Sequence, residues 1–123
     1  MRFPQLLKRA DRVVRRTVQA LPTELRAPAA ALPVTYERAP SPELLADGDL
    51  KPDTLGLFLG AAHGEEPGPH PLPSQIMLFL MNLWDYAEGD AGVFDEEVRV
   101  TYLHELGHYL GLDEGDLERR GLE

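Results

Sequence analysis

The sequence predicts an α+β domain with an N-terminal helix, a small sheet of about three strands and a long C-terminal helix. Apolar residues recur every three to four positions near both ends of the chain, which is typical of amphipathic helices. Short apolar runs bounded by turn residues lie between them and favour strands. The length of 123 residues suits one domain. We therefore expect a single domain over residues 1–123.

The composition excludes several classes of protein. Charged residues make up 27% and hydrophobic residues 43%, so neither a disordered nor a fibrous chain is expected. There is no cysteine, so a metal site must use His, Asp or Glu. The longest apolar run, residues 76–81, is too short to span a membrane. The N-terminus lacks the apolar core of a secretory signal, which predicts a cytoplasmic protein, although its Arg-rich start also fits an organellar transit peptide.

The charges are distributed unevenly along the chain. Residues 1–38 contain eight basic and three acidic residues, a net charge of +5, whereas residues 39–123 contain four basic and eighteen acidic residues, a net charge of −14. An acidic surface repels phosphate backbones, so nucleic acid is not expected as a partner. The basic face of the first helix is expected to be solvated or paired with acidic groups, and contact with nucleic acid or lipid is the alternative.

The elements are expected in the following order. A helix covers about residues 4–20, where apolar side chains form one stripe. Pro22, Pro28 and Pro33 should then break any helix and lead into a strand over residues 34–37. The Pro, Asp and Gly residues within 41–53 favour a loop that can include one helical turn.

Two short apolar runs follow, residues 54–61 and 75–80, and both favour strands. The segment between them, residues 63–73, is too rich in Pro and Gly for regular structure. We expect its histidines, His63 and His70, to be exposed; the alternative is that they reach the cleft as oxyanion donors or gatekeepers. A short helix is expected over residues 82–88. Asp95 is the expected cap of the last long helix.

The last helix contains the motif that predicts chemistry. Residues 104–114 read His-Glu-Leu-Gly-His-Tyr-Leu-Gly-Leu-Asp-Glu. His104 and His108 are four residues apart, so they differ by about 40° around a helix and can bind one metal ion. With Val98 at zero, the two histidines fall near 240° and 280°. The apolar side chains cover roughly 40° to 200° and should form the buried stripe beside them; these are Val100, Tyr102, Leu103, Leu106 and Leu110.

Glu105 is the candidate general base. It points about 100° away from His104, which places it near a water on the ion rather than on the ion itself. Zinc lowers the pKa of such a water, and a carboxylate can accept its proton and later protonate a leaving amine. Tyr109 shares the side of Glu105 and could donate to the developing oxyanion, although a half-buried core tyrosine is the simpler interpretation.

A third metal ligand is expected just beyond the helix. Gly111 can take the left-handed conformation that ends a helix and lets the chain turn back. Glu114 lies ten residues after His104, the spacing at which a third ligand follows this pattern. Asp113 and Asp116 are the alternatives.

Over residues 98–117 the chain resembles the small bacterial zincin-like metallopeptidases, and upstream Leu55-Gly56-Leu57 matches a Leu-Gly-Leu element of that family. The resemblance implies a minimal zincin-like fold and a Zn²⁺-dependent hydrolase. In it His104 and His108 would bind the zinc, Glu105 would act as the base, and an acidic residue at position 114 would complete the site. That family often has aspartate where this chain has Glu114.

The leading hypothesis is a zinc-dependent peptidase that acts on peptides or unfolded proteins. One alternative is a non-catalytic zincin module that binds zinc or peptides. A second is a metal-dependent RNA-processing hydrolase, since the motif helix is similar to that of the bacterial ribosomal RNA maturation family. That family has glycine at the position of Glu105 and histidine at the position of Glu114, and the acidic surface of this chain disfavours RNA. Nine residues follow Glu114, so we expect either an open groove or a partner or second subunit that completes the cleft. An edge strand, residues 54–61 or 75–80, is expected to align the substrate.

Overall fold

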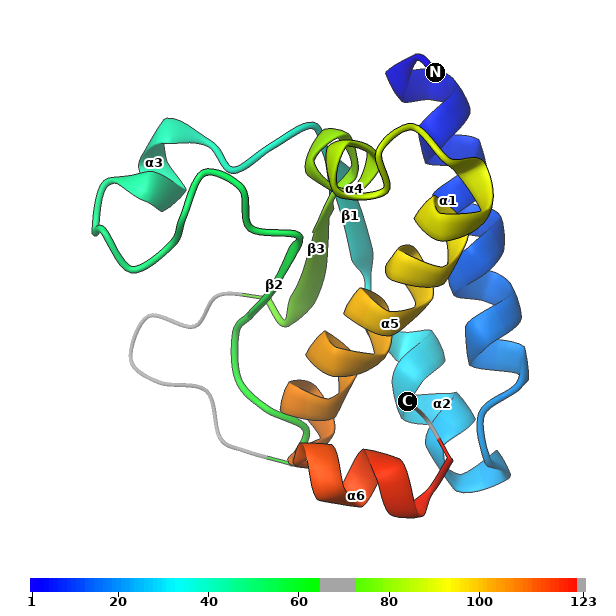
Figure 1. The fold of residues 1–123 in the computed structure, drawn as a ribbon. Helices are drawn as coiled ribbons and strands as arrows, with labels where there is room; N and C mark the ends of the chain where they lie inside the picture. The colour runs from blue at the N-terminus through cyan, green and yellow to red at the C-terminus, as the bar shows by residue number, and fades with distance from the viewer. Residues whose placement is uncertain (65–72, 122–123) are drawn as a thin grey trace.

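The computed structural model describes residues 1–64 and 73–121. The α+β class is confirmed, and in Figure 1 one long helix, α5, runs through the middle of the molecule with α1 on one side and the sheet on the other. The elements in chain order are α1 (Phe3–Gln19), α2 (Thr23–Ala31), β1 (Val34–Glu37), α3 (Pro42–Leu45), β2 (Gly56–Leu59), β3 (Gln75–Phe79), α4 (Leu80–Tyr86), α5 (Ala91–Leu110) and α6 (Glu114–Arg119).

Within residues 1–64 and 73–121 the sheet has three strands, in the order β1-β3-β2. β1 is parallel to β3, with Val34 opposite Ile76, and β2 is antiparallel to β3, with Gly56 opposite Leu78. Ile76 and Leu78 are fully buried, as expected for a central strand covered by helices. Among the residues that the structure describes, β3 is the central strand, and β2 is the edge strand that lies against α5.

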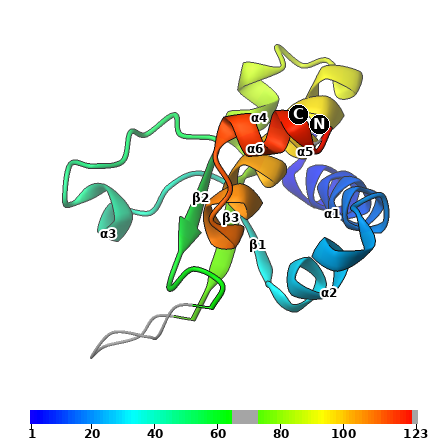
Figure 2. The ribbon, with the colours of Figure 1, turned by 90° about the horizontal axis from the view of Figure 1, so that it is seen from below.

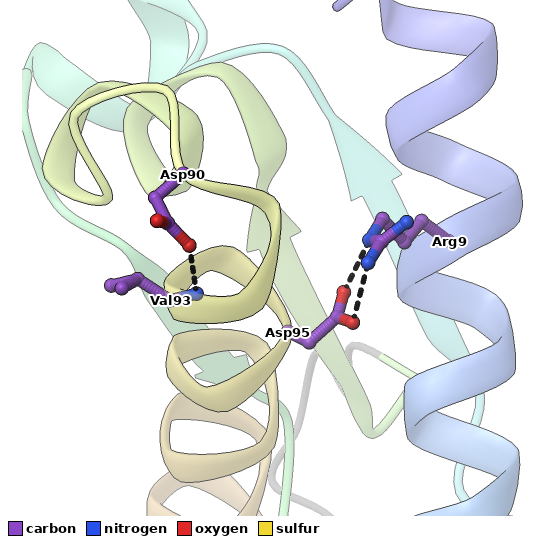
Figure 3. A network of polar contacts seen from close by, with 4 residues as sticks. All are labelled: Arg9, Asp90, Val93 and Asp95. Carbon is purple, nitrogen blue, oxygen red and sulfur yellow. Dashed lines mark hydrogen bonds and ion pairs between the residues drawn. The ribbon is translucent and has the colours of Figure 1, made fainter.

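The first helix packs against α5 through its apolar stripe. Its buried side chains include Leu6, Ala10 and Val14, which confirms the predicted helix. At the same interface the guanidinium of Arg9 donates two hydrogen bonds to the carboxylate of Asp95, at 2.7 and 2.9 Å (Figure 3). One member of the basic face is therefore paired with an acid of the last long helix.

The prediction that Asp95 caps this helix is wrong. The cap is Asp90, whose side chain accepts a hydrogen bond of 2.9 Å from the backbone N–H of Val93 (Figure 3). That bond satisfies one of the N–H groups that have no partner at a helix start. The helix thus begins about one turn earlier than expected, and Asp95 is free to pair with Arg9 instead.

The prediction that prolines break any helix after α1 is also wrong, because α2 forms there. Pro22 precedes the helix and Pro33 follows it, so neither disturbs a helical hydrogen bond. Pro28 lies inside α2, where a proline costs about 3 kcal/mol. Burial of Leu25 and Ala29 in the core offsets this cost.

The remaining elements lie close to their predicted places or were not anticipated. The strand over residues 34–37 and the single helical turn of α3 are confirmed. Figures 1 and 2 both show α3 projecting away from the rest of the molecule. β3 ends at Phe79, and α4 begins at the next residue. The start of α4 is therefore two residues earlier than predicted. α6 was not predicted; the side chain of Asp113 caps it.

Helix α5 is buried over a wider arc than its apolar pattern predicts. Val100, placed at the edge of the predicted stripe, is 39% exposed. Thr101, Phe94 and Glu105 lie on the opposite arc and are buried. The reason is that α5 is covered twice, by α1 on one side and by the sheet on the other. An apolar stripe describes one buried face of a helix, so it does not predict burial of the face that the second neighbour covers.

Candidate metal centre

The end of α5 is shaped by two glycines. Gly111 has φ +71° and a left-handed conformation, which confirms that it ends the helix. The N–H of Leu112 returns to the carbonyl of Gly107 at 2.8 Å. A Cβ atom at Gly107 would lie 3.2 Å from Cδ1 of Leu117 in α6, so the glycine lets α6 pack against the helix beside His108. The chain after the motif therefore stays close to the two histidines.

His104, Glu105 and His108 form a compact cluster. One possible ligand atom from each lies within 4.8 Å of the others. The two imidazole rings are 4.6 Å apart between centroids, which confirms that the four-residue spacing brings them together. Nδ1 of His108 lies 3.3 Å from Oε1 of Glu105. Glu105 is therefore closer to both histidines than its 100° rotation suggested, because its long side chain can reach across.

The carboxylate of Glu105 is covered, whereas the histidines face solvent. Glu105 is 8% exposed. Strand β2 lies close against this part of α5: a Cβ atom at Gly56 would be only 2.6 Å from Cγ2 of Thr101. A buried carboxylate requires a polar partner, and the His108 imidazole supplies one. A glycine inside a strand indicates close backbone approach, so Gly56 was the sequence signal for this contact.

A cleft of about 500 Å³ opens on the exposed side of the cluster. Both histidines line it, and the other lining residues are Gly107, Gly111, Leu112, Asp113 and Leu117. The walls are thus mainly apolar, with the two imidazoles and one carboxylate as polar groups. This is the kind of concave, largely apolar site with a few convergent polar groups that binds small ligands or side chains.

The acidic residues after the helix differ in what they bind. Asp113 and Asp116 form a reciprocal cap in which the carboxylate of each accepts the backbone N–H of the other, at 2.7 and 3.1 Å. Asp116 also pairs with Arg119. The backbone N–H of Asp113, and then Arg119, hold the pKa of Asp116 below its usual value. Glu114 is the first residue of α6, and its side chain lies outside the described part of the structure.

Tyr109 and His63 meet at the edge of β2, although 46 residues separate them. Tyr109 is half-buried and packs against the core, as the simpler interpretation held. His63 is exposed, as predicted, but its Nδ1 lies 3.3 Å from the Tyr109 hydroxyl. No spacing pattern could have predicted that contact. His70 lies outside the described residues.

The cluster suits a zinc ion. Imidazole nitrogen and carboxylate oxygen are the zinc ligands available to a chain without cysteine. Two exposed imidazoles on one helical face, beside a carboxylate and an open cleft, can hold a metal while leaving room for a substrate. The Glu105 carboxylate lies 3.3 Å from Nδ1 of His108, and a carboxylate beside the metal ligands can exchange a proton with a nearby water.

Comparison with known proteins adds one finding. The profile of the zincin-like metallopeptidase family matches residues 29–122, which is most of the chain and includes the cluster. A search of curated proteins finds no match. None of the helices within residues 1–64 and 73–121 combines the length and apolar character that a membrane span requires.

Proposed function

Because the chain belongs to the zincin-like metallopeptidase family, we propose that it is a zinc-dependent peptidase with Glu105 as the general base. The observation that carries this proposal is the placement of His104, Glu105 and His108 on α5, with candidate ligand atoms within 4.8 Å of one another. The cleft beside them supports it, because a catalytic zinc site needs an open position as well as protein ligands.

We assign His104 and His108 as two zinc ligands and Glu114 as the third. Asp116 is the weakest alternative, because its carboxylate is occupied by a backbone N–H and by Arg119. Asp113 lines the cleft with both histidines and is the stronger alternative, but one of its oxygens already caps α6. Glu114 begins α6 directly after these turns, next to the cleft wall, which favours it.

The role of Glu105 follows from its position. Bound zinc would supply a Lewis acid that polarises a carbonyl and acidifies water. The Glu105 carboxylate lies 3.3 Å from the His108 imidazole and can take the proton of a water that attacks the scissile carbonyl. It can then deliver that proton to the leaving amine. Burial shields the carboxylate from bulk solvent, so its electrostatic interactions with the reacting groups are stronger.

Strand β2 is the candidate platform for the substrate. It is the edge strand next to α5, and within the described residues its ladder partner is β3. An extended peptide can add to such an edge through main-chain hydrogen bonds, with little dependence on sequence. This favours short or unfolded peptides as substrates.

The test measures zinc content and cleavage separately. We expect about one zinc per chain, and loss of zinc in the His104→Ala/His108→Ala variant, because three protein ligands hold one ion. Glu105→Gln should retain zinc while cleavage of labelled casein falls by about 100-fold or more. Glu96→Gln is the matched control, since Glu96 lies on the same helix and pairs with Arg99 at the surface. Undiminished cleavage by Glu105→Gln would reject Glu105 as the base.

A second candidate function, a non-catalytic zinc module, is favoured by one observation. The Glu105 carboxylate lies close enough to both imidazoles to serve as a fourth ligand. A zinc ion with four protein ligands has a structural rather than a catalytic coordination. In that case X-ray absorption of the zinc-loaded protein would show four protein donors and no water, Glu105→Gln would weaken zinc binding, and the wild type would cut no peptide.

A further inference from the structure

Tyr109 lies one helical turn after Glu105, on the same side of α5. A helical side chain leans toward the N-terminus, so we expect the Tyr109 side chain to lean toward the turn that contains Glu105. At about 100° per residue, His104, His108, Glu105 and Tyr109 follow one another around the helix over about 140°. Tyr109 therefore borders the proposed base on the side away from the two histidines.

Two hydrogen-bonding contacts join His63 to Tyr109. The backbone N–H of His63 donates to the carbonyl of Tyr109 at 2.7 Å, and Nδ1 of His63 lies 3.3 Å from the Tyr109 hydroxyl. The carbonyl belongs to the last turn of α5, where the helix itself provides no donor. The two rings also pack, with centroids 5.4 Å apart. The His63 imidazole is thus held against Tyr109 through both main chain and side chain.

The part of the loop that carries His63, residues 60–64, is anchored near the end of β2. Gly60 has φ +99°, and a Cβ atom there would lie 2.6 Å from Cα of Ser74. The Ser74 hydroxyl donates to the carbonyl of Ala61 at 2.6 Å. On β2 itself, the Phe58 ring packs against Tyr109 with centroids 5.7 Å apart. The Tyr109 ring is therefore held by both Phe58 and the anchored loop.

We infer that the Tyr109 hydroxyl is a further catalytic group, which donates a hydrogen bond to the carbonyl oxygen of the scissile peptide bond, and that His63 is the residue that positions it. This inference rests on the proposed peptidase function. When the proton of the imidazole is on Nδ1, His63 donates to the tyrosine oxygen and leaves the hydroxyl hydrogen free for the substrate. A donor aimed at a developing oxyanion stabilises the transition state more than the bound substrate.

Kinetics of labelled-casein cleavage test the role of Tyr109. Tyr109→Phe should lower kcat by about 100-fold, the effect of losing one oxyanion donor, while KM and zinc content stay unchanged. Tyr86→Phe is the matched control, because Tyr86 is 61% exposed on α4. An unchanged kcat in Tyr109→Phe, with an active wild type, overturns this inference and leaves the proposed function standing. Absence of cleavage by the zinc-loaded wild type overturns both.

The positioning role of His63 has its own tests. His63→Ala should lower kcat in the wild-type background but have no further effect in Tyr109→Phe, because His63 acts through that hydroxyl. His63→Asn places an amide donor near the position of Nδ1 and should restore most of the lost activity.

A direct readout is ¹⁵N NMR of the His63 ring in the zinc-loaded protein. We expect the Nδ1–H tautomer, and a shift toward the Nε2–H form in Tyr109→Phe. An Nε2–H tautomer in the wild type, with Nδ1 accepting from the tyrosine, would overturn the inference, since the hydroxyl hydrogen would then be bound to His63.

Discussion

Gly56 offers the most direct test of how closely the sheet packs against the helix that carries the candidate site. A methyl group at this position would lie 2.6 Å from Cγ2 of Thr101, and 3.3 Å from both a Leu78 side-chain atom and the Met77 carbonyl. The first contact is far inside van der Waals separation, so β2 or α5 must move in Gly56→Ala. Overpacking of this kind costs about 1–3 kcal/mol. The lower backbone entropy of alanine in the unfolded chain returns about 0.5–1 kcal/mol.

The net expectation for Gly56→Ala is a loss of about 1–2 kcal/mol in the free energy of unfolding. At this chain length that corresponds to a fall in Tm of roughly 3–5 °C per kcal/mol. Urea unfolding followed by circular dichroism measures the loss. Zinc binding should persist, because His104 and His108 both belong to α5. Casein cleavage should fall, because the clash displaces β2, the proposed substrate platform, relative to the helix that carries Glu105.

A double-mutant cycle identifies the cause. Thr101→Ser removes the clashing methyl group and keeps the hydroxyl. In the Thr101→Ser background, Gly56→Ala should lower the free energy of unfolding by less than about 1 kcal/mol. The remaining contacts, with Leu78 and the Met77 carbonyl at 3.3 Å, need only small adjustments. If Gly56→Ala is as stable as the wild type, or if Thr101→Ser restores nothing, β2 does not lie against α5 as closely as we describe.

Three further predictions concern the framework of the fold. Asp90→Ala should lower the free energy of unfolding by about 1 kcal/mol in urea titrations through loss of the helix cap. Asp95→Asn should lower the free energy of unfolding by less than about 1 kcal/mol, because both side chains of its pair with Arg9 are about one-third exposed. In a double-mutant cycle, adding Arg9→Gln to Asp95→Asn should cause no further loss of stability. Burial, together with the neighbouring Asp11, raises the pKa of Tyr36 above its ordinary value. The unfolded chain therefore ionises first, and stability should fall as pH rises above about 10. Tyr36→Phe should flatten that decline; an unchanged pH profile would contradict it.

Much of the candidate site follows from spacing within one helix. Two histidines four residues apart lie on one face of any α-helix, and a glycine three residues later is suited to the left-handed end that Gly111 adopts. These features depend only on backbone geometry over a few residues. For the same reason the amphipathic α1 and the short β1 could be placed from their patterns.

The errors arise where distant segments meet. Pro28 argued against α2, yet the helix forms because its apolar side chains join the core. Asp95 had the character of a cap, but Asp90 takes that place and Asp95 pairs with Arg9 of another helix. Local preferences of about 1–3 kcal/mol are easily outweighed by burial across the fold.

Helical spacing alone was therefore enough to bring His104 and His108 together, because the pitch of a helix is the same in every protein. The order of the strands, the burial of Glu105 and the contact between His63 and Tyr109 were decided only when the sheet packed against α5. The physical reason is that burial and long-range hydrogen bonds depend on which surfaces meet in three dimensions, and the separation of residues along the chain does not determine that.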